Sequence, residues 1–262
     1  MGIQGYPYDP YADPVIQALI AEAQADPDAI GLVLTGSRAL GEATDESDYD
    51  VIFVVTDEAI ARYEQAGRQP VRGASIAPPI DTEDIWSDSP GSLQLGKQVD
   101  WMLPAYAESL VLYDRTGETA RVIDAIRRMP EERAREEASR CYDGYLNALY
   151  RSLKCWRRGN RLGGRLEAAD SIGGLLSTLF ALERRWTPYR SRLHHHLHHL
   201  EGQGWADGEL QTFLLDLAGT GDPRRQQELA HRVVALLSDR GHHAVYEDWG
   251  GKIDTALAWE FE

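Results

Sequence analysis

Hydrophobic residues follow two different patterns along the chain. In the first 116 residues they form short runs, often β-branched, separated by stretches with helical spacing. Four runs predict β-strands, at residues 30–34 (IGLVL), 51–55 (VIFVV), 98–103 (QVDWML) and 110–113 (LVLY). The first two runs are apolar throughout, which is typical of buried strands.

The stretches between these runs predict helices and one irregular segment. Residues 13–25 place Val15 and Leu19, among other apolar residues, at helical spacing, and residues 58–65 predict a second helix. Residues 69–91 are rich in Pro, Ser and Asp and predict an irregular segment. Strands separated by helices indicate a fold of the α+β class, with a mixed β-sheet flanked by helices.

After Gly117 the pattern changes to long amphipathic helices. Helices are predicted at residues 118–128, 132–158, 166–185, 208–217, 223–240 and 253–259. This half predicts a helical bundle. We therefore expect two domains, a mixed-sheet domain over residues 1–117 and a helical domain over residues 118–262.

Charge and composition narrow the class of partner. The chain of 262 residues has a formal net charge of −15, whereas proteins that bind long nucleic acids need broad basic surfaces. We expect no long nucleic acid and no membrane partner, because no run approaches the length of a membrane span. No basic segment followed by an apolar one opens the sequence, so we expect a cytoplasmic protein. Cys141 and Cys155 are too few for a disulfide framework and predict reduced helix residues.

Candidate chemistry gathers between the first two predicted strands, in TGSRALGEATDESDYD. Gly36 follows the strand end, where a glycine lets the backbone approach a ligand closely. Ser37 offers a hydroxyl and an N–H at the start of a predicted helix, a place that favours anions. The second glycine, Gly41, permits the chain to turn back.

Acidic residues follow this turn. Asp48 and Asp50 are predicted to lie on the strand that continues as VIFVV, where residues two apart point to the same face, so we expect their carboxylates side by side. Two adjacent carboxylates repel each other unless a cation lies between them, and oxygen ligands with open positions suit Mg²⁺. Asp100 lies in a third predicted strand, and if that strand is a neighbour, three carboxylates converge, enough to bind two metal ions.

This ordered set resembles the nucleotidyltransferase superfamily that includes DNA polymerase beta. It is most similar to the small-molecule branch, the aminoglycoside and related antibiotic nucleotidyltransferases. The residues that carry the resemblance are Gly36, Ser37, Asp48, Asp50 and Asp100. The later segment VLYDRTG is similar to the one that closes the catalytic domain in that branch.

The resemblance implies roles for these residues. Gly36 and Ser37 would hold the phosphates of a nucleoside triphosphate, while Asp48 and Asp50 would ligate Mg²⁺. Asp100 would complete a metal site, act as general base toward a substrate hydroxyl, or do both. The reaction would attach a nucleoside monophosphate, such as AMP from ATP, to a small hydroxylated acceptor and release pyrophosphate. The acidic chain would suit a cationic acceptor such as an aminoglycoside.

Two basic residues are further candidates for nucleotide binding. Arg38 follows the Gly-Ser turn, and Lys154 lies in a predicted helix of the second half, from which related enzymes often supply a lysine to the triphosphate. Exposed basic residues near a helix end are the alternative interpretation of Lys154. Glu167 and Glu183 are alternatives to Asp100 as the base, although a solvated helix face explains both.

Other interpretations remain open. The same fold also serves in transferring AMP to a protein, as in short antitoxin-like members, or in a nucleotide-binding regulator without catalysis. The run LHHHLHHL places His194 and His198, and likewise His195 and His199, four residues apart on a predicted helix. That spacing suits a transition metal, but a partly exposed helix with its leucines inward is the simpler interpretation.

Overall fold

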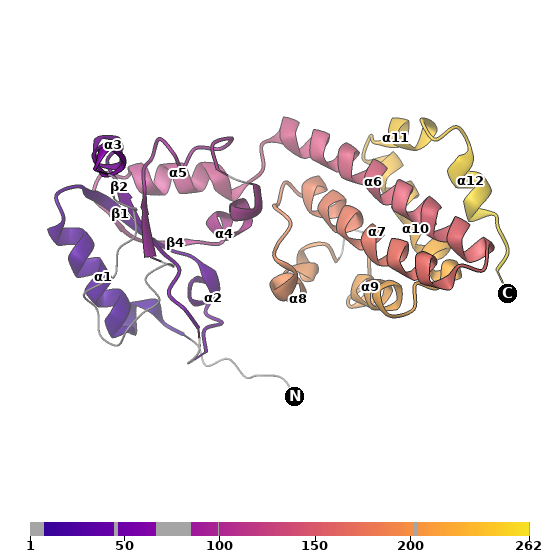
Figure 1. Cartoon of the computed structure of the whole chain (residues 1–262), viewed down its shortest axis with the longest axis horizontal. Coiled ribbons are helices and arrows are strands. Elements are labelled where there is room, and N and C mark those ends of the chain that lie inside the picture. The colour runs from indigo at the N-terminus through magenta and orange to yellow at the C-terminus, as the bar shows by residue number, and fades with distance from the viewer. Residues whose placement is uncertain (1–7, 45–46, 67–84, 99, 202–203, 262) are drawn as a thin grey trace. The chain divides into compact units, whose positions relative to one another are not determined.

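A computed structural model describes residues 8–44, 47–66, 85–98, 100–201 and 204–261 of the chain. The chain divides into two compact units, Met1–Arg128 and Met129–Glu262 (Figure 1). The first contains a mixed β-sheet flanked by helices, and the second is helical. The predicted fold class is therefore confirmed.

In the described residues the sheet contains four strands, in the order β3-β2-β1-β4. Strand β1 (Ala29–Leu34) lies in the centre and pairs antiparallel with β2 (Val51–Val55) and with β4 (Leu110–Asp114). Strand β3 (Ile85–Asp88) pairs parallel with β2. The sheet is mixed because β3 alone runs parallel to its neighbour.

Helices cover both faces of the sheet. Helix α1 (Pro14–Ala25) packs its buried side chains, Leu19 among them, in one cluster with Leu32 and Phe53 of the strands. On the other face, Gly31 lies so close to α5 (Glu118–Arg127) that an added Cβ would stand 2.0 Å from the Thr119 hydroxyl. Burial on both faces explains why β1 and β2 are apolar at every position.

Most of the predicted elements of this unit form where the pattern places them. Strands β1, β2 and β4 match their predicted runs, and α1 and α3 (Asp57–Gln65) match the predicted helices. Helix α5 groups with the first compact unit, since its buried face packs on the sheet, whereas the periodicity placed it at the start of the helical half. Short helices complete the unit, at Pro10–Ala12 (η1), Gly36–Ala39 (α2), Asp100–Met102 (η3) and Leu103–Ala107 (α4).

Two predictions in this unit are wrong. The run at residues 98–103 forms no strand in its described part, because it leads through η3 into α4, whose first turn contains Pro104. Proline favours the first turn of a helix, and a short apolar run does not distinguish helix from strand by itself. The stretch at residues 69–91 contains strand β3, although its residues 69–84 lie outside the described part.

Two long helices form the framework of the second unit. Helices α6 (Glu131–Arg157) and α7 (Arg161–Leu182) are joined by a tight turn at Gly159, whose φ is +74°. Asn160 caps α7, because its side chain accepts a hydrogen bond from the Gly163 N–H at 3.0 Å. Gly174 of α7 lies against backbone atoms of α6, so the two helices pack closely.

Shorter helices complete the apolar core of this unit. They are α9 (Glu209–Gly219), α10 (Pro223–Asp239), α11 (His243–Glu247) and α12 (Lys252–Leu257). Buried side chains of α9, α10 and α12, such as Leu210, Leu229 and Ile253, join Tyr145 and Phe180 of the two long helices in one cluster. The predicted bundle is confirmed, with α11 as an additional helix that the periodicity did not indicate.

The histidine-rich run does not form the single helix that its spacing suggested. It divides into the short helices α8 (Leu193–His196) and η5 (Leu197–His199), after a 3-10 turn at Arg190–Arg192. Leu197 and Leu200 are buried and hold the run against the core. In the described part of the chain, no helix is both long and apolar enough to cross a bilayer. Both cysteines are free, as predicted.

Candidate functional site

Pairing of β1 with β2 brings the Gly-Ser turn beside the second aspartate. Leu34 is paired with Val51, and one residue further the Thr35 N–H donates a hydrogen bond to the carbonyl of Asp50 at 2.8 Å. An antiparallel ladder fixes which residues lie opposite each other. Gly36 and Asp50 are therefore spatial neighbours, although fourteen residues separate them.

Gly36 is shaped to receive the Asp50 carboxylate. Its φ is +73°, in the left-handed region that favours glycine, and a Cβ added there would lie 1.8 Å from Oδ2 of Asp50. Any other residue at this position would be strained and would occupy the place of the carboxylate. The glycine of the turn and the aspartate before β2 thus form one fitted pair.

Ser37 and Asp48 lie next to this pair. Ser37 is half-buried in α2, which is a single turn of helix rather than the longer helix that an extended dipole would need. Asp48 is exposed and Asp50 is half-buried. Both precede β2, which begins at Val51, so the prediction that they lie on the strand itself is wrong.

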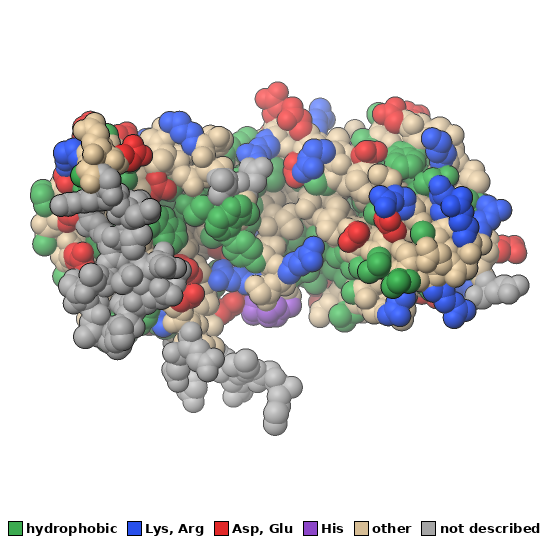
Figure 2. Space-filling model, in the orientation of Figure 1, with side chains coloured by type: hydrophobic (Ala, Val, Ile, Leu, Met, Phe, Trp, Pro, Cys, Tyr) green, Lys and Arg blue, Asp and Glu red, His purple; other side chains and the backbone are tan. Residues whose placement is uncertain are grey.

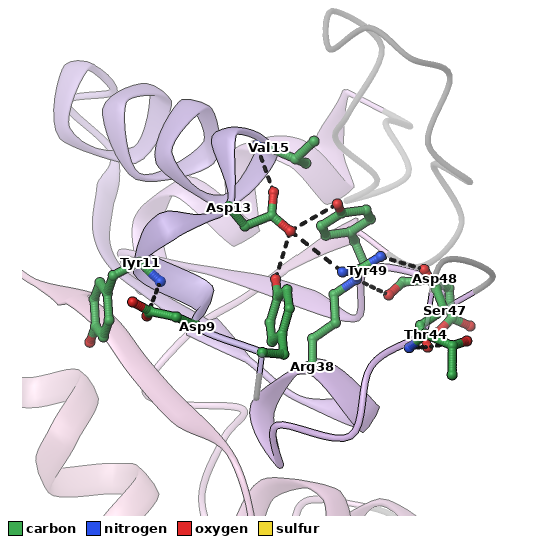
Figure 3. A network of polar contacts seen from close by, with 10 residues as sticks. Asp9, Tyr11, Asp13, Val15, Arg38, Thr44, Ser47, Asp48 and Tyr49 are labelled. Carbon is green, nitrogen blue, oxygen red and sulfur yellow. Dashed lines mark hydrogen bonds and ion pairs between the residues drawn. The ribbon is translucent and has the colours of Figure 1, made fainter. Parts of the chain in front are cut away.

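Arg38 holds the segment that carries Asp48. Its side chain is buried, Nε donates to the carbonyl of Asp48 at 2.8 Å, and Nη2 donates to the carbonyl of Ser47 at 2.7 Å (Figure 3). The guanidinium lies over the ring of Tyr49 at 3.7 Å from its centroid. These contacts make Arg38 a support for the acidic segment. A phosphate contact of Arg38 stays a prediction.

Asp13 anchors this support from the N-terminus of α1. One carboxylate oxygen accepts hydrogen bonds from the hydroxyls of Tyr8 at 2.7 Å and Tyr49 at 3.0 Å, and lies 3.4 Å from Nη1 of Arg38. The other accepts from the Val15 N–H at 2.8 Å, which caps the helix (Figure 3). One carboxylate thus joins α1, the Gly-Ser turn and the segment before β2.

Electrostatics follow from this packing. Burial alone would raise the pKa of Asp13, but the hydrogen bonds from Tyr8, Val15 and Tyr49 outweigh it and hold that pKa below its usual range. Burial, together with the hydrogen bond to Asp13, raises the pKa of Tyr49. The cluster is therefore most stable with a charged aspartate and neutral tyrosines.

Sequence reasoning missed this cluster. Asp13 was included only as the start of a helix, and Tyr8 and Tyr49 were not singled out. The available signal was the Asp-Pro pair at residues 13–14, since an aspartate before a proline is a common helix start. Nothing in the spacing indicates that its free oxygen would bind two tyrosines and an arginine.

Asp100 and Lys154 lie on other elements than Asp48 and Asp50. Asp100 begins η3 rather than continuing a strand, and its approach to Asp48 and Asp50 stays a prediction. Lys154 belongs to the second unit, where its ammonium lies 5.2 Å from the centroid of the Tyr150 ring. Its contact with a nucleotide also stays a prediction.

A half-buried carboxylate, that of Asp88, lies elsewhere on the sheet. Burial raises the pKa of Asp88, at the end of β3, although hydrogen bonds from Ser92, the Ser89 N–H and Gln98 oppose the shift. Asp88 is level with Val54 of β2, four residues beyond Asp50. That separation along a strand is about 13 Å. Asp88 therefore does not take the place predicted for Asp100.

The donor set decides whether a metal ion fits this site. No group of three or more His, Cys, Asp or Glu side chains in the described part of the chain is arranged to hold an ion. Asp48 and Asp50 nevertheless offer two carboxylates, and that of Asp50 lies in the space left by the missing Cβ of Gly36. Two carboxylates with substrate phosphates and water suit Mg²⁺, so the residues present fit this ion.

Comparisons with known proteins add little. No family model and no curated protein matches the chain. Solved structures do match, among them the crystal structure of a nucleotidyltransferase-like protein from Exiguobacterium sibiricum 255-15. That protein is 12% identical, with 93% of this chain and 77% of the other covered and a TM-score of 0.43. A similarity this distant does not place the chain in a family.

We predict that the Asp13 cluster makes stability depend on pH. Because the folded state holds the pKa of Asp13 below its usual range, the charged form stabilises the native chain above that range. This contribution is lost as the pH falls through the lowered value. In urea unfolding, the native chain should exceed Asp13→Asn in free energy of unfolding at neutral pH, and the difference should shrink on acidification.

Asp124→Asn is the control, because Asp124 is 70% exposed and pairs with Arg127 at the surface. Its effect should stay within about 0.5 kcal/mol throughout. A difference for Asp13→Asn that is constant with pH would contradict the role given to its charge.

Proposed function

We propose that this protein is a Mg²⁺-dependent nucleotidyltransferase. It would transfer a nucleoside monophosphate, such as AMP from ATP, to a hydroxyl of a small molecule and release pyrophosphate. The observation that carries the proposal is the fit of the Asp50 carboxylate against Gly36, whose missing Cβ leaves the space that the carboxylate fills. This joins a carboxylate pair to a turn that can approach a phosphate closely.

Asp48 and Asp50 are the residues that would hold Mg²⁺. When bound, the ion would neutralise the triphosphate and lower the pKa of the acceptor hydroxyl. Gly36 and Ser37 would face the phosphates, because N–H groups in the first turn of a helix have no partner within the helix. Since α2 is a single turn, these local N–H groups and the Ser37 hydroxyl would bind, without a long helix dipole.

The chemistry needs a proton acceptor besides the metal ligands. In the proposed reaction, the acceptor oxygen bonds to the α-phosphorus while the bond to pyrophosphate breaks, and the proton leaves the acceptor hydroxyl. Asp100 would take this proton. The two alternative bases in the second unit form ion pairs, Glu167 with Arg151 and Glu183 with Arg240. Either carboxylate would have to break its ion pair before it could accept the proton.

The net charge of the chain indicates the class of acceptor. A net charge of −15 favours a cationic, hydroxylated compound of the aminoglycoside class and disfavours a polynucleotide.

We predict that transfer depends on both carboxylates. The native chain should release pyrophosphate from one of the four nucleoside triphosphates with Mg²⁺ and one member of a panel of aminoglycosides, other hydroxylated antibiotics and helical proteins. Mass spectrometry should show an acceptor heavier by one nucleotide. Asp48→Asn and Asp50→Asn should each lower the rate by about a hundredfold or more, because a metal ligand is lost.

Asp88→Asn is the control, as a carboxylate of the same sheet outside the site. It should leave the rate of correctly folded protein unchanged. If the modified acceptor is a protein, the enzyme transfers AMP to proteins and not to a small molecule. Nucleotide bound without transfer, equally well by native and Asp50→Asn chains, would contradict catalysis.

A matched pair of glycines tests the fit at Gly36. Gly36 and Gly41 both have φ of +73°, so replacement by alanine should cost each about 1–2 kcal/mol in backbone strain. Among the described residues, the new Cβ at Gly41 would meet the Tyr8 carbonyl at 3.9 Å, whereas at Gly36 it would displace the Asp50 carboxylate. Gly36→Ala should therefore lower the transfer rate at least about tenfold more than Gly41→Ala. Equal rates would show that the position of Asp50 does not matter.

A further inference from the structure

The turn between α6 and α7 is strongly basic, although the chain as a whole is acidic. Residues 151–165 contain six Lys or Arg and no Asp or Glu, in a chain of net charge −15. Figure 2 shows Lys and Arg side chains (blue) at the end of the second unit where α6 and α7 meet, toward the right of the view. Such a local reversal of charge would attract anions.

Several of these charges are uncompensated. Arg158 and Arg161 are exposed, and neither has an acidic partner within ion-pair distance among the described residues. Arg157 lies over the Trp259 ring, 4.7 Å from its centroid, which orients its guanidinium without neutralising it. Fixed but unpaired guanidinium groups are suited to phosphate, which they bind through two parallel hydrogen bonds.

A cavity opens beside this turn, within the second unit. Its volume is about 500 Å³, in the range of small-molecule sites, and Arg157, Arg161 and Arg224 line it together with Trp156 and Phe261. The guanidinium of Arg224 is oriented by hydrogen bonds from Nε and Nη2 to the carbonyl of Phe261. The walls thus combine arginines with two aromatic side chains.

The two acidic residues at the cavity do not cancel this character. The carboxylate of Asp222 caps α10, where it accepts hydrogen bonds from the N–H groups of Arg224 at 2.9 Å and Arg225 at 3.0 Å. Glu260 is the other acid. A carboxylate beside arginines and aromatic rings suits the hydroxyl or amino groups of a ring-bearing ligand.

We propose that this cavity binds a small phosphorylated compound with a planar ring, such as a nucleoside diphosphate, without a metal ion. The arginines bind the phosphates and the aromatic walls contact the ring. A long nucleic acid is disfavoured, because the basic stretch covers a single turn and the rest of the chain is acidic. The site consists only of residues from the second unit and does not depend on the proposed function.

Calorimetric titration of the full chain with ADP in the presence of EDTA tests this inference. We expect metal-independent binding that weakens as salt is added. Arg161→Ala should weaken it about tenfold, and the double variant Arg157→Ala, Arg161→Ala about a hundredfold, since hydrogen bonds to charged groups are lost. The single variant is the safer test, because the Arg161 side chain forms no ion pair with a described residue, and its loss would leave the fold undisturbed.

Arg140→Ala is the matched control, as another exposed arginine of α6 that lies outside the cavity. Its binding of ADP should equal that of the native chain. Asp50→Asn should also bind normally in EDTA, which separates this site from the one in the first unit. Inorganic pyrophosphate should bind more weakly than ADP, because it has no ring.

Several results would overturn the inference. Absence of metal-free binding would remove the site, and loss of binding in Asp50→Asn would assign it to the first unit. If Arg140→Ala weakened ADP binding as much as Arg161→Ala does, the binding would reflect general electrostatic attraction and not a specific site. Equal affinities for pyrophosphate and ADP would refute the ring-bearing class, and a single-stranded RNA that binds more tightly than ADP would refute a small ligand.

Discussion

The hydrogen bond from the Thr35 N–H to the Asp50 carbonyl continues the β1–β2 ladder one residue past its last strand pair, and the candidate site depends on it. Strand register leaves little freedom here, because a shift by one residue would turn the buried side chains of both strands to the wrong face. With that register, Gly36 must lie beside Asp50. The absence of a Cβ at Gly36 then permits a contact that no other residue would allow.

A second layer of interactions holds the acidic segment outside the strand. The Thr35 bond fixes Asp50, and the Arg38 guanidinium supports the residues before it by binding the carbonyls of Ser47 and Asp48. Arg38 is held by the Asp13 carboxylate and the Tyr49 ring. A buried arginine with a charged partner and carbonyl acceptors is stable, whereas the same group alone would carry a large desolvation cost.

The fold class and most element positions could be predicted from the sequence, because their signals are local. Strands β1 and β2 are apolar at every position, and the helix of residues 118–127 repeats its buried positions at helical spacing. The run at residues 98–103 was wrongly predicted as a strand because so short a run fits a strand and a helix equally well. Pro104, in the first turn of α4, favours the helix. Strand β3 was missed because its partner β2 is distant in sequence and its run is only four residues long.

The sequence indicates candidate residues of the site, but it does not indicate the contacts that support them. The motif indicates Gly36 and Asp50, but their contact follows from the strand register. The Arg38 side chain binds the carbonyl of Asp48, ten residues away, and this contact follows from side-chain packing. Long-range packing of this kind leaves no periodic signal in one sequence.

The most direct test of the central claim is a crystal structure with Mn²⁺ and a non-hydrolysable ATP analogue, with the metal located by its anomalous scattering. The account predicts an ion about 2.0–2.3 Å from carboxylate oxygens of both Asp48 and Asp50, with the analogue's phosphates beside Gly36 and Ser37. An ion bound elsewhere, or an analogue bound away from Gly36 with both carboxylates uncoordinated, would contradict it.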